Sequence, residues 1–285
     1  MNDVKRIAVI GAGTMGAGIV QTAATHGFAV TMIDVRDELV EGALAGIRER
    51  IGKSVARGKR TEEEAAAILA RISIGTDLSK AAAGADFVVE AIPEDLGMKR
   101  DLFARLDAVV SPDAILASNT SSLSLSRIAE ASSRPERVVG AHFFNPVPVM
   151  ELLEVVRARQ TSEETVEVTK ALGGALGKTV IVVRDTPGFA TSRLGVVLGL
   201  EAMRMLEQGV ASAEDIDRAM ELGYRHPMGP LMLTDLVGLD VRLGIAEYLH
   251  AELGGEQYAP PAILLALVAE GRLGKKSGRG FYDWY

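Results

Sequence analysis

The first residues with types and spacing suited to chemistry are the glycines of a turn near the start of the chain. Gly11-Ala-Gly-Thr-Met-Gly16 follows an apolar run at residues 6–10 and opens a helical pattern. The next apolar run, residues 29–33, ends in Asp34, about 20 residues beyond the glycines. This strand, GxGxxG turn, helix and acid form the fingerprint of dinucleotide binding in a Rossmann fold.

Each glycine of the turn has its own physical task. Gly11 allows the tight turn, Gly13 lets backbone amides approach a pyrophosphate, and Gly16 lets the helix lie close to the sheet. Thr14 and Met15 complete the expected cofactor site, where free N–H groups and the helix dipole attract the phosphates. The alternative is a glycine-rich turn without a ligand.

Asp34 bears on the choice of cofactor. A carboxylate at this position accepts hydrogen bonds from both ribose hydroxyls and repels a 2′-phosphate, so it favours NAD over NADP. Arg36 lies close by and works against this preference.

A histidine and a glutamate are the candidates for acid–base chemistry. His142 follows the strand-like run 138–141, at the sheet edge where doubly wound folds bind ligands. Glu154 interrupts the apolar run 152–156, where an unpaired buried carboxylate is costly and an imidazolium is the simplest partner. The alternatives are a core histidine without a catalytic role and an edge strand whose polar side faces water.

The elements that must position these residues alternate between strands and helices. This alternation predicts an α/β fold, a doubly wound, mainly parallel sheet of the Rossmann type. A charged stretch, residues 37–71, reads as an inserted helical hairpin broken at 58–60, with a capping box from Thr61 to Glu64. After the first two strands, the expected strands are 72–74, 87–90, 115–118, 138–141, 152–156 and 180–183.

The pattern changes after Val183, where strand signals give way to helical periodicity. We expect an NAD-binding domain at residues 1–185 and an all-α domain for substrate binding and dimerisation at residues 186–285. Its helices are predicted at 190–208, 212–222, 230–253 with possible breaks, and 261–270. The apolar composition of the first favours a homodimer interface, and an ordinary core helix is the alternative.

Composition excludes several classes of protein. The 285 residues include no cysteine, which rules out thiolate chemistry and agrees with a reducing, cytoplasmic location. A net charge of −7 argues against nucleic-acid binding. No apolar run reaches the roughly 18 residues of a membrane span. We expect no metal site, and the motif begins too early for a signal peptide to precede it.

Several segments together resemble the short-chain L-3-hydroxyacyl-CoA dehydrogenase family, which includes the 3-hydroxybutyryl-CoA dehydrogenases. The similarity runs nearly end to end and follows the family's order and spacing. The segments are Val89-Glu-Ala-Ile-Pro-Glu94, Ser118-Asn-Thr-Ser-Ser-Leu123, His142-Phe-Phe-Asn-Pro-Val-Pro-Val-Met150 with Glu154, Thr186-Pro-Gly-Phe189, His226-Pro-Met-Gly-Pro230 and Gly274-Lys-Lys-Ser-Gly278 with Gly280-Phe-Tyr282.

The resemblance implies roles for individual residues. His142 would be the general base and Glu154 its partner, Ser121 would bind the substrate's C3 oxygen, and Asn145 would help to position nicotinamide and substrate. The hairpin would contact coenzyme A through basic residues such as Lys53 and Arg57, although such residues are also typical of a solvated face. Around the cofactor the family places Glu94, Lys99, Asn119 and Lys276.

One position departs from the family pattern Gly-Phe-Val-x-Asn-Arg. This chain reads Gly188-Phe-Ala-Thr-Ser-Arg193, so Ser192 replaces the asparagine near the substrate. A hydroxyl still donates and accepts a hydrogen bond, and we expect activity with an altered rate or chain-length preference.

The resulting expectation is an NAD-dependent oxidoreductase that interconverts short (S)-3-hydroxyacyl-CoA and 3-ketoacyl-CoA thioesters, as in β-oxidation and related fatty acid metabolism. Two alternatives stay open. One is a dehydrogenase of a free hydroxy acid such as gulonate, and the other is a non-catalytic protein like lambda-crystallin.

Overall fold

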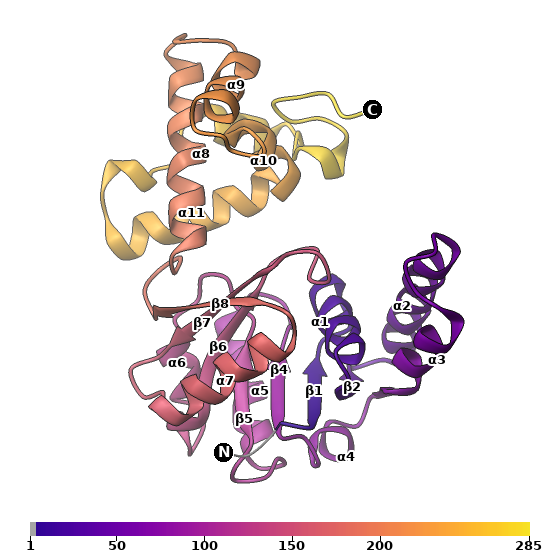
Figure 1. Ribbon diagram of the computed structural model, residues 1–285. Coiled ribbons are helices and arrows are strands. Elements are labelled where there is room, and N and C mark those ends of the chain that lie inside the picture. The colour runs from indigo at the N-terminus through magenta and orange to yellow at the C-terminus, as the bar shows by residue number, and fades with distance from the viewer. Residues whose placement is uncertain (1–3) are drawn as a thin grey trace. The chain divides into compact units, whose positions relative to one another are not determined.

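The computed structural model describes residues 4–285, which divide into two compact units (Figure 1). The first extends through Asp185 and the second begins at Thr186. Each unit has a hydrophobic core of its own.

A single eight-stranded sheet forms the centre of the first unit, in the order β3-β2-β1-β4-β5-β6-β7-β8. Of its described strand pairs, β6 with β7 is antiparallel and the others are parallel, so the prediction of a mainly parallel, doubly wound sheet is confirmed. The strands are β1 (Arg6–Ile10), β2 (Ala29–Ile33), β3 (Ile72–Gly75), β4 (Phe87–Glu90), β5 (Ile115–Ser118), β6 (Val138–Phe143), β7 (Leu152–Arg157) and β8 (Thr179–Arg184).

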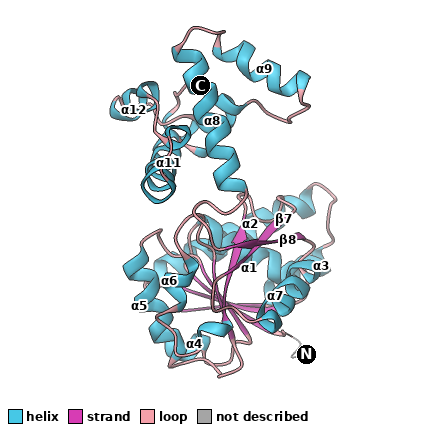
Figure 2. Cartoon of the chain, turned by 90° about the vertical axis from the view of Figure 1, so that its left-hand side faces the viewer, coloured by secondary structure: helices cyan, strands magenta, loops and turns pink. Residues whose placement is uncertain are grey.

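Helices cover both faces of the sheet (Figure 2). One face carries α1 (Thr14–Thr25), α2 (Asp37–Ala56), α3 (Glu62–Ala70) and α7 (Glu163–Ala175), whose apolar side chains join one core cluster with the strands. The other face carries α4 (Leu78–Ala82), α5 (Leu96–Asp107) and α6 (Leu125–Ala129), and a short 3-10 helix at Pro135–Arg137 precedes β6.

The inserted hairpin consists of α2 and α3. The Thr61 hydroxyl accepts a hydrogen bond from the Glu64 amide at 3.1 Å, and the Glu64 carboxylate accepts one from the Thr61 amide at 2.9 Å. The predicted capping box is therefore confirmed, and it fixes the start of the second arm.

The second unit is helical, with α8 (Thr191–Glu207), α9 (Ala213–Gly223), α10 (Pro230–Val237), α11 (Leu239–Leu253), α12 (Ala262–Ala269) and 3-10 turns at Glu256–Tyr258 and Lys275–Ser277. Gly238, at a φ of +107°, separates α10 from α11. In α8, Val196, Leu200 and Met203 are buried in this unit's own core. These side chains are covered without a second copy of the chain, as in the alternative of an ordinary core helix.

Two buried aspartates hold the C-terminal segment. Asp235 accepts hydrogen bonds from the amides of Phe281 and Tyr282 and from the Trp284 indole, each at 2.9 Å. Asp217 accepts one from the Tyr282 hydroxyl at 2.8 Å and also binds two amides of the first turn of α10. Burial and the hydrogen bond to Asp217 raise the pKa of Tyr282 well above its usual value. Within residues 4–285, no helix has the length and apolar character needed to cross a lipid bilayer.

Candidate active site

The glycine-rich turn has no room for a side chain where it faces the sheet, at Gly11 and Gly16, but it has open space at Gly13. Gly11 has a φ of +110°, and a Cβ added there would lie 2.4 Å from the Ala91 carbonyl oxygen. A Cβ on Gly16 would lie 1.8 Å from the Gly11 oxygen. A Cβ on Gly13, in contrast, would meet no atom of the described chain within 4 Å. The turn therefore needs glycine inside and leaves room for a ligand beside Gly13.

The N-terminus of α1 begins directly after Gly13. Within the described residues no side chain caps this end, so its orphan amides and the positive end of the dipole suit an anion. Asp34 lies beside the turn, where its two oxygens accept hydrogen bonds from the amides of Ala12 and Val35, each at 2.7 Å. Its carboxylate is thus oriented at the carboxyl end of β2.

The strand order reverses between β1 and β4, which makes this edge of the sheet a topological switch point. Carboxyl ends of parallel strands meet at one edge. Gly11 after β1, Glu90 at the end of β4 and Ser118 at the end of β5 therefore lie along it. Open α/β sheets bind their ligands at such an edge.

His142 and Glu154 face each other on neighbouring antiparallel strands. They are directly paired in the register of β6 and β7, and Nδ1 of His142 lies 2.7 Å from Oε2 of Glu154. The imidazole is 4% exposed and the glutamate 0%. A buried carboxylate on Nδ1 fixes the ring's orientation and its tautomer, which makes Nε2 the nitrogen on the side away from Glu154.

Two details of the sequence interpretation of this pair are corrected. His142 lies within β6 rather than beyond it, because pairing with β7 continues through Phe143. The alternative of a water-facing edge strand for Glu154 is wrong, because β7 lies between β6 and β8. The Phe144 ring lies 4.5 Å from the imidazole, centroid to centroid, at the start of the next loop.

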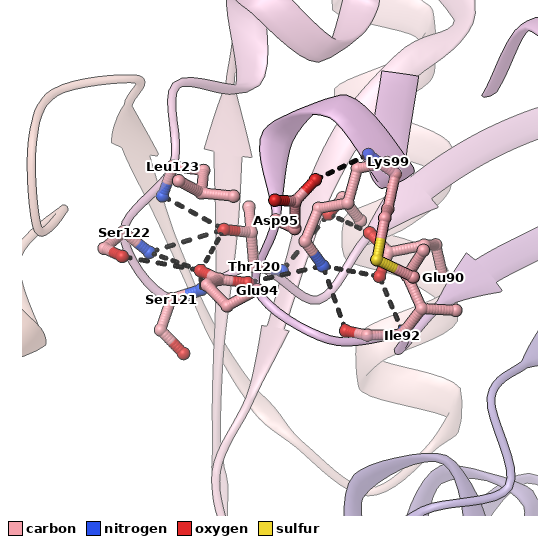
Figure 3. A network of polar contacts seen from close by, with 11 residues as sticks. Glu90, Ile92, Glu94, Asp95, Lys99, Thr120, Ser121, Ser122 and Leu123 are labelled. Carbon is pink, nitrogen blue, oxygen red and sulfur yellow. Dashed lines mark hydrogen bonds and ion pairs between the residues drawn. The ribbon is translucent and has the colours of Figure 1, made fainter. Parts of the chain in front are cut away.

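A network of polar contacts holds the turn that carries Ser121 (Figure 3). One oxygen of Glu94, Oε1, accepts hydrogen bonds from the Thr120 hydroxyl at 2.5 Å and from the amides of Ser121 and Ser122 at 3.0 and 3.3 Å. The Ser121 side chain points away from Glu94. The turn is therefore tied down by its backbone while this hydroxyl stays on its outer side.

Lys99 is 1% exposed and lies inside this network. Its ammonium group lies 2.5 Å from Oε1 of Glu90 and 3.3 Å from Oε2 of Glu94, and it donates to the Ile92 carbonyl oxygen at 3.3 Å. Three protein acceptors thus surround the group that was expected beside the cofactor.

Two asparagines expected at the site differ in their surroundings. The Asn119 side-chain oxygen accepts a hydrogen bond from the Phe143 amide at 2.8 Å, so it links the end of β5 to the strand of His142. Asn145 is exposed in the loop after β6, where it precedes Pro146 in a cis peptide bond.

The remaining expected residues lie on helices or in the second unit. Lys53 and Arg57 are exposed at the end of α2, where Lys53 pairs with Glu49 at 2.6 Å. Ser192 lies in the first turn of α8 and is half-buried. The Lys276 ammonium pairs with Asp240 at 2.5 Å within the second unit.

Comparison with known proteins decides the family. The sequence profile of the NAD-binding domain of 3-hydroxyacyl-CoA dehydrogenases matches residues 6–186, and the profile of their C-terminal domain matches residues 188–284. The chain belongs to the 3-hydroxyacyl-CoA dehydrogenase family. It is 43% identical over 287 residues to a 3-hydroxybutyryl-CoA dehydrogenase of Mycobacterium tuberculosis, with all of both chains covered.

Further relatives agree with this assignment. A 3-hydroxybutyryl-CoA dehydrogenase of Bradyrhizobium diazoefficiens is 43% identical over 281 residues, which cover 99% of this chain and 96% of the relative. The crystal structure of (S)-3-hydroxybutyryl-CoA dehydrogenase from Ralstonia eutropha superposes with a TM-score of 0.94 at 40% identity and covers 99% of each chain. The predicted family, fold class and enzyme class are confirmed.

NAD is the cofactor of this member of the 3-hydroxyacyl-CoA dehydrogenase family, and the residues present fit it. The open space beside Gly13 and the uncapped start of α1 suit a pyrophosphate, and the held carboxylate of Asp34 suits the two hydroxyls of an adenosine ribose.

One polar residue of the site was missed by the sequence interpretation. Glu90 is fully buried at the end of β4 and binds Lys99 and Ser118. The signal was available, because an acid ends an otherwise apolar strand just as Glu154 interrupts one.

Proposed function

We propose that the protein interconverts short (S)-3-hydroxyacyl-CoA and 3-ketoacyl-CoA thioesters, such as 3-hydroxybutyryl-CoA and acetoacetyl-CoA. The observation that carries this proposal is the buried His142–Glu154 pair, held in register at the carboxyl end of β6. Such a pair can move one proton without exposing a charge to water.

In the oxidation direction, His142 acts as the general base. Its Nε2 accepts the proton of the C3 hydroxyl, and Glu154 stabilises the imidazolium that forms. Bound NAD supplies the hydride acceptor. In the reverse direction the imidazolium returns its proton to the ketone oxygen.

Ser121 donates a hydrogen bond to the C3 oxygen, where negative charge develops during the reaction. Its place on the outer side of a turn fixed by Glu94 supports this role. Asn145 helps to orient nicotinamide and substrate, and Thr14 and Met15 line the phosphates. Asn119 acts through β6, because its side chain binds the Phe143 amide.

The other expected contacts belong to the same proposal. Lys53 and Arg57, at the end of α2, bind coenzyme A phosphates. Their exposure to solvent supports this role. From the helical domain, Ser192 binds substrate and Lys276 binds cofactor.

We place the enzyme in the cytoplasm, in agreement with its lack of cysteine, and propose a homodimer. Exposed apolar side chains on α10 and α11 support a subunit contact, namely Leu233, Leu236, Val237 and Val241. Light scattering tests this point, and a mass of one chain would contradict it.

The function is tested by mixing the protein with acetoacetyl-CoA and following NADH consumption, with NADPH and a free keto acid in parallel. We expect turnover with NADH and the thioester alone. Turnover of the free acid instead would favour a hydroxy-acid dehydrogenase.

His142→Gln tests the proposed base. We expect kcat to fall about 10²–10⁴-fold, because general acid–base catalysis contributes that much. Affinity for NADH, measured by fluorescence titration, stays unchanged because the nucleotide turn is untouched. A variant with normal turnover would exclude His142 as the base.

A further inference from the structure

Glu90 has no task in the reaction proposed above, yet it is a fully buried carboxylate at the switch point. Its Oε1 accepts hydrogen bonds from the Ile92 amide at 2.8 Å and from the Lys99 ammonium at 2.5 Å. Its Oε2 accepts one from the Ser118 hydroxyl at 2.5 Å. A single carboxylate thus joins β4, α5 and the end of β5.

Lys99 connects this carboxylate to a second one. Its ammonium bridges Glu90 and Glu94, so two acids share one buried cation (Figure 3). Glu94 is itself 39% exposed at its side chain, and its Oε2 lies 3.3 Å from the Lys99 ammonium. A chain of charged contacts therefore runs from the buried Glu90 to the outer Glu94.

The chain ends on the turn that carries Ser121. The Thr120 hydroxyl and the amides of Ser121 and Ser122 all donate to one atom, Oε1 of Glu94. A shift of that atom moves all three donors together. From the other side, the Ser118 hydroxyl that binds Glu90 also accepts a hydrogen bond from the Thr120 amide at 3.2 Å.

We propose that Glu90 and Lys99 are positioning residues that set the place of the Ser121 hydroxyl against the substrate's C3 oxygen. They act from both ends of the turn, through Glu94 and through Ser118. This inference rests on the proposed function, since it requires that Ser121 contacts that oxygen.

Glu90→Gln is the first test. The amide keeps the size of the side chain but turns an N–H₂ or a neutral oxygen toward the Lys99 ammonium, so the bridge to Glu94 loosens. We expect kcat for acetoacetyl-CoA reduction to fall about 10–100-fold, as for a misplacement on the order of 1 Å. The KM for the thioester changes less than about threefold, because the expected coenzyme A contacts on α2 remain.

Arg100→Met is the matched control. Arg100 follows Lys99 on α5, and its guanidinium contacts the Glu130 carboxylate at 3.4 Å and the Arg127 carbonyl oxygen at 2.5 Å, both outside the network. We expect wild-type kcat and KM. Urea unfolding of both variants separates lost activity from lost fold.

Coupling to Ser121 distinguishes positioning from a purely structural role. Ser121→Ala is measured in the wild-type and in the Glu90→Gln background. If Glu90 acts through Ser121, the serine substitution lowers kcat at least about fivefold less in the second background, since residues that act as a unit are not additive. Equal losses in the two backgrounds would overturn the proposal.

Ser118→Ala provides the same test if Glu90→Gln does not fold. It removes the second link to the turn without leaving a buried charge unpaired, and its effect must also be non-additive with Ser121→Ala. Wild-type turnover of acetoacetyl-CoA is measured first. Its absence would count against the proposed function, whereas turnover with additive losses would count against this inference alone.

Discussion

Single buried charges in this protein differ in how well they are partnered. Glu154, Glu90 and Asp235 are each 0% exposed, and each has hydrogen-bond donors from neighbouring strands or loops. Arg242 on α11 is different. It is 7% exposed, and within residues 4–285 its Nε has no hydrogen-bond partner. Burial alone lowers the pKa of Arg242 to about 10.

Replacing this arginine is expected to stabilise the protein. The lowered pKa means that burial disfavours the charged form, by an amount on the order of a few kcal/mol. Arg242→Met keeps the apolar stem and removes the charge, so we expect the free energy of unfolding to rise by about 1–3 kcal/mol in urea at pH 7.

The comparison for this prediction is Arg218→Met, whose guanidinium is exposed beside Asp215 and whose effect should stay within about 0.5 kcal/mol. A loss of stability in Arg242→Met would show that the guanidinium has a stabilising partner. In the wild-type, the unfolded chain binds more protons than the folded one in the alkaline window above about pH 10. The contribution of Arg242 to stability therefore becomes more favourable as pH rises through that window.

The sequence identifies a polar site residue when that residue interrupts or ends a regular apolar run. Glu154 was found because it breaks an apolar strand, and Asp34 because it ends one at a fixed distance from the glycines. The hydrogen-bond donors to Glu94 and Asp235 are different, since they lie 26–28 and 46–49 residues away along the chain. Such contacts depend on how loops meet after folding, and no spacing rule specifies them.

At the scale of elements, one lysine holds the loop that follows His142. Lys178, just before β8, donates hydrogen bonds to the carbonyl oxygens of Val147 and Met150 at 2.6 and 2.7 Å. Val147 packs so closely on α1 that a Cβ on Gly18 would lie 2.9 Å from it. Desolvation lowers the pKa of Lys178, and the charge of Glu151 opposes that shift. The loop carrying Asn145 is therefore fixed between α1 and β8.

Lys178→Met is expected to free this loop. Both carbonyl oxygens lose a charged donor, and such bonds contribute about 1.5–3 kcal/mol each. We expect faster amide hydrogen exchange in residues 144–151 and a kcat about tenfold lower. Lys170→Met is the control, because Lys170 on α7 pairs with the neighbouring Glu167 at the surface. Unchanged exchange in the loop would contradict the anchoring role.

The sequence predicts which helices and strands form, but it predicts the residues at which they end less accurately. The break expected within residues 230–253 lies at Gly238, and the hairpin starts its second arm at the predicted cap. Strand β6 extends two residues past its expected end because the antiparallel partner β7 continues the ladder. A strand's length is set by its neighbours in the sheet, which a single run of residues does not reveal.

At the scale of the molecule, the residues expected to bind cofactor and substrate come from both units. The nucleotide turn, the His142–Glu154 pair and the Ser121 turn all lie in the first unit, whereas Ser192 and Lys276 lie in the second. The second unit also depends on the end of the chain, because Asp235 is buried against residues 281–284.

Removal of residues 281–285 is expected to destabilise the helical unit by about 3–5 kcal/mol, since it leaves a buried carboxylate without these partners. Removal of Tyr285 alone, which is 94% exposed, should change stability by less than about 0.5 kcal/mol. Urea unfolding is followed by circular dichroism, because the one tryptophan, Trp284, is lost in the longer truncation. Equal midpoints for the two truncations would show that the C-terminal contacts are dispensable.

The two buried aspartates also govern the order in which a nascent chain folds. The sheet has all its strands once Arg184 has been made, while Asp235 of the helical unit gains its last donor only with Trp284. A chain that stops before residue 281 would therefore carry all the strands of the sheet, joined to helices in which the buried Asp235 lacks these three donors.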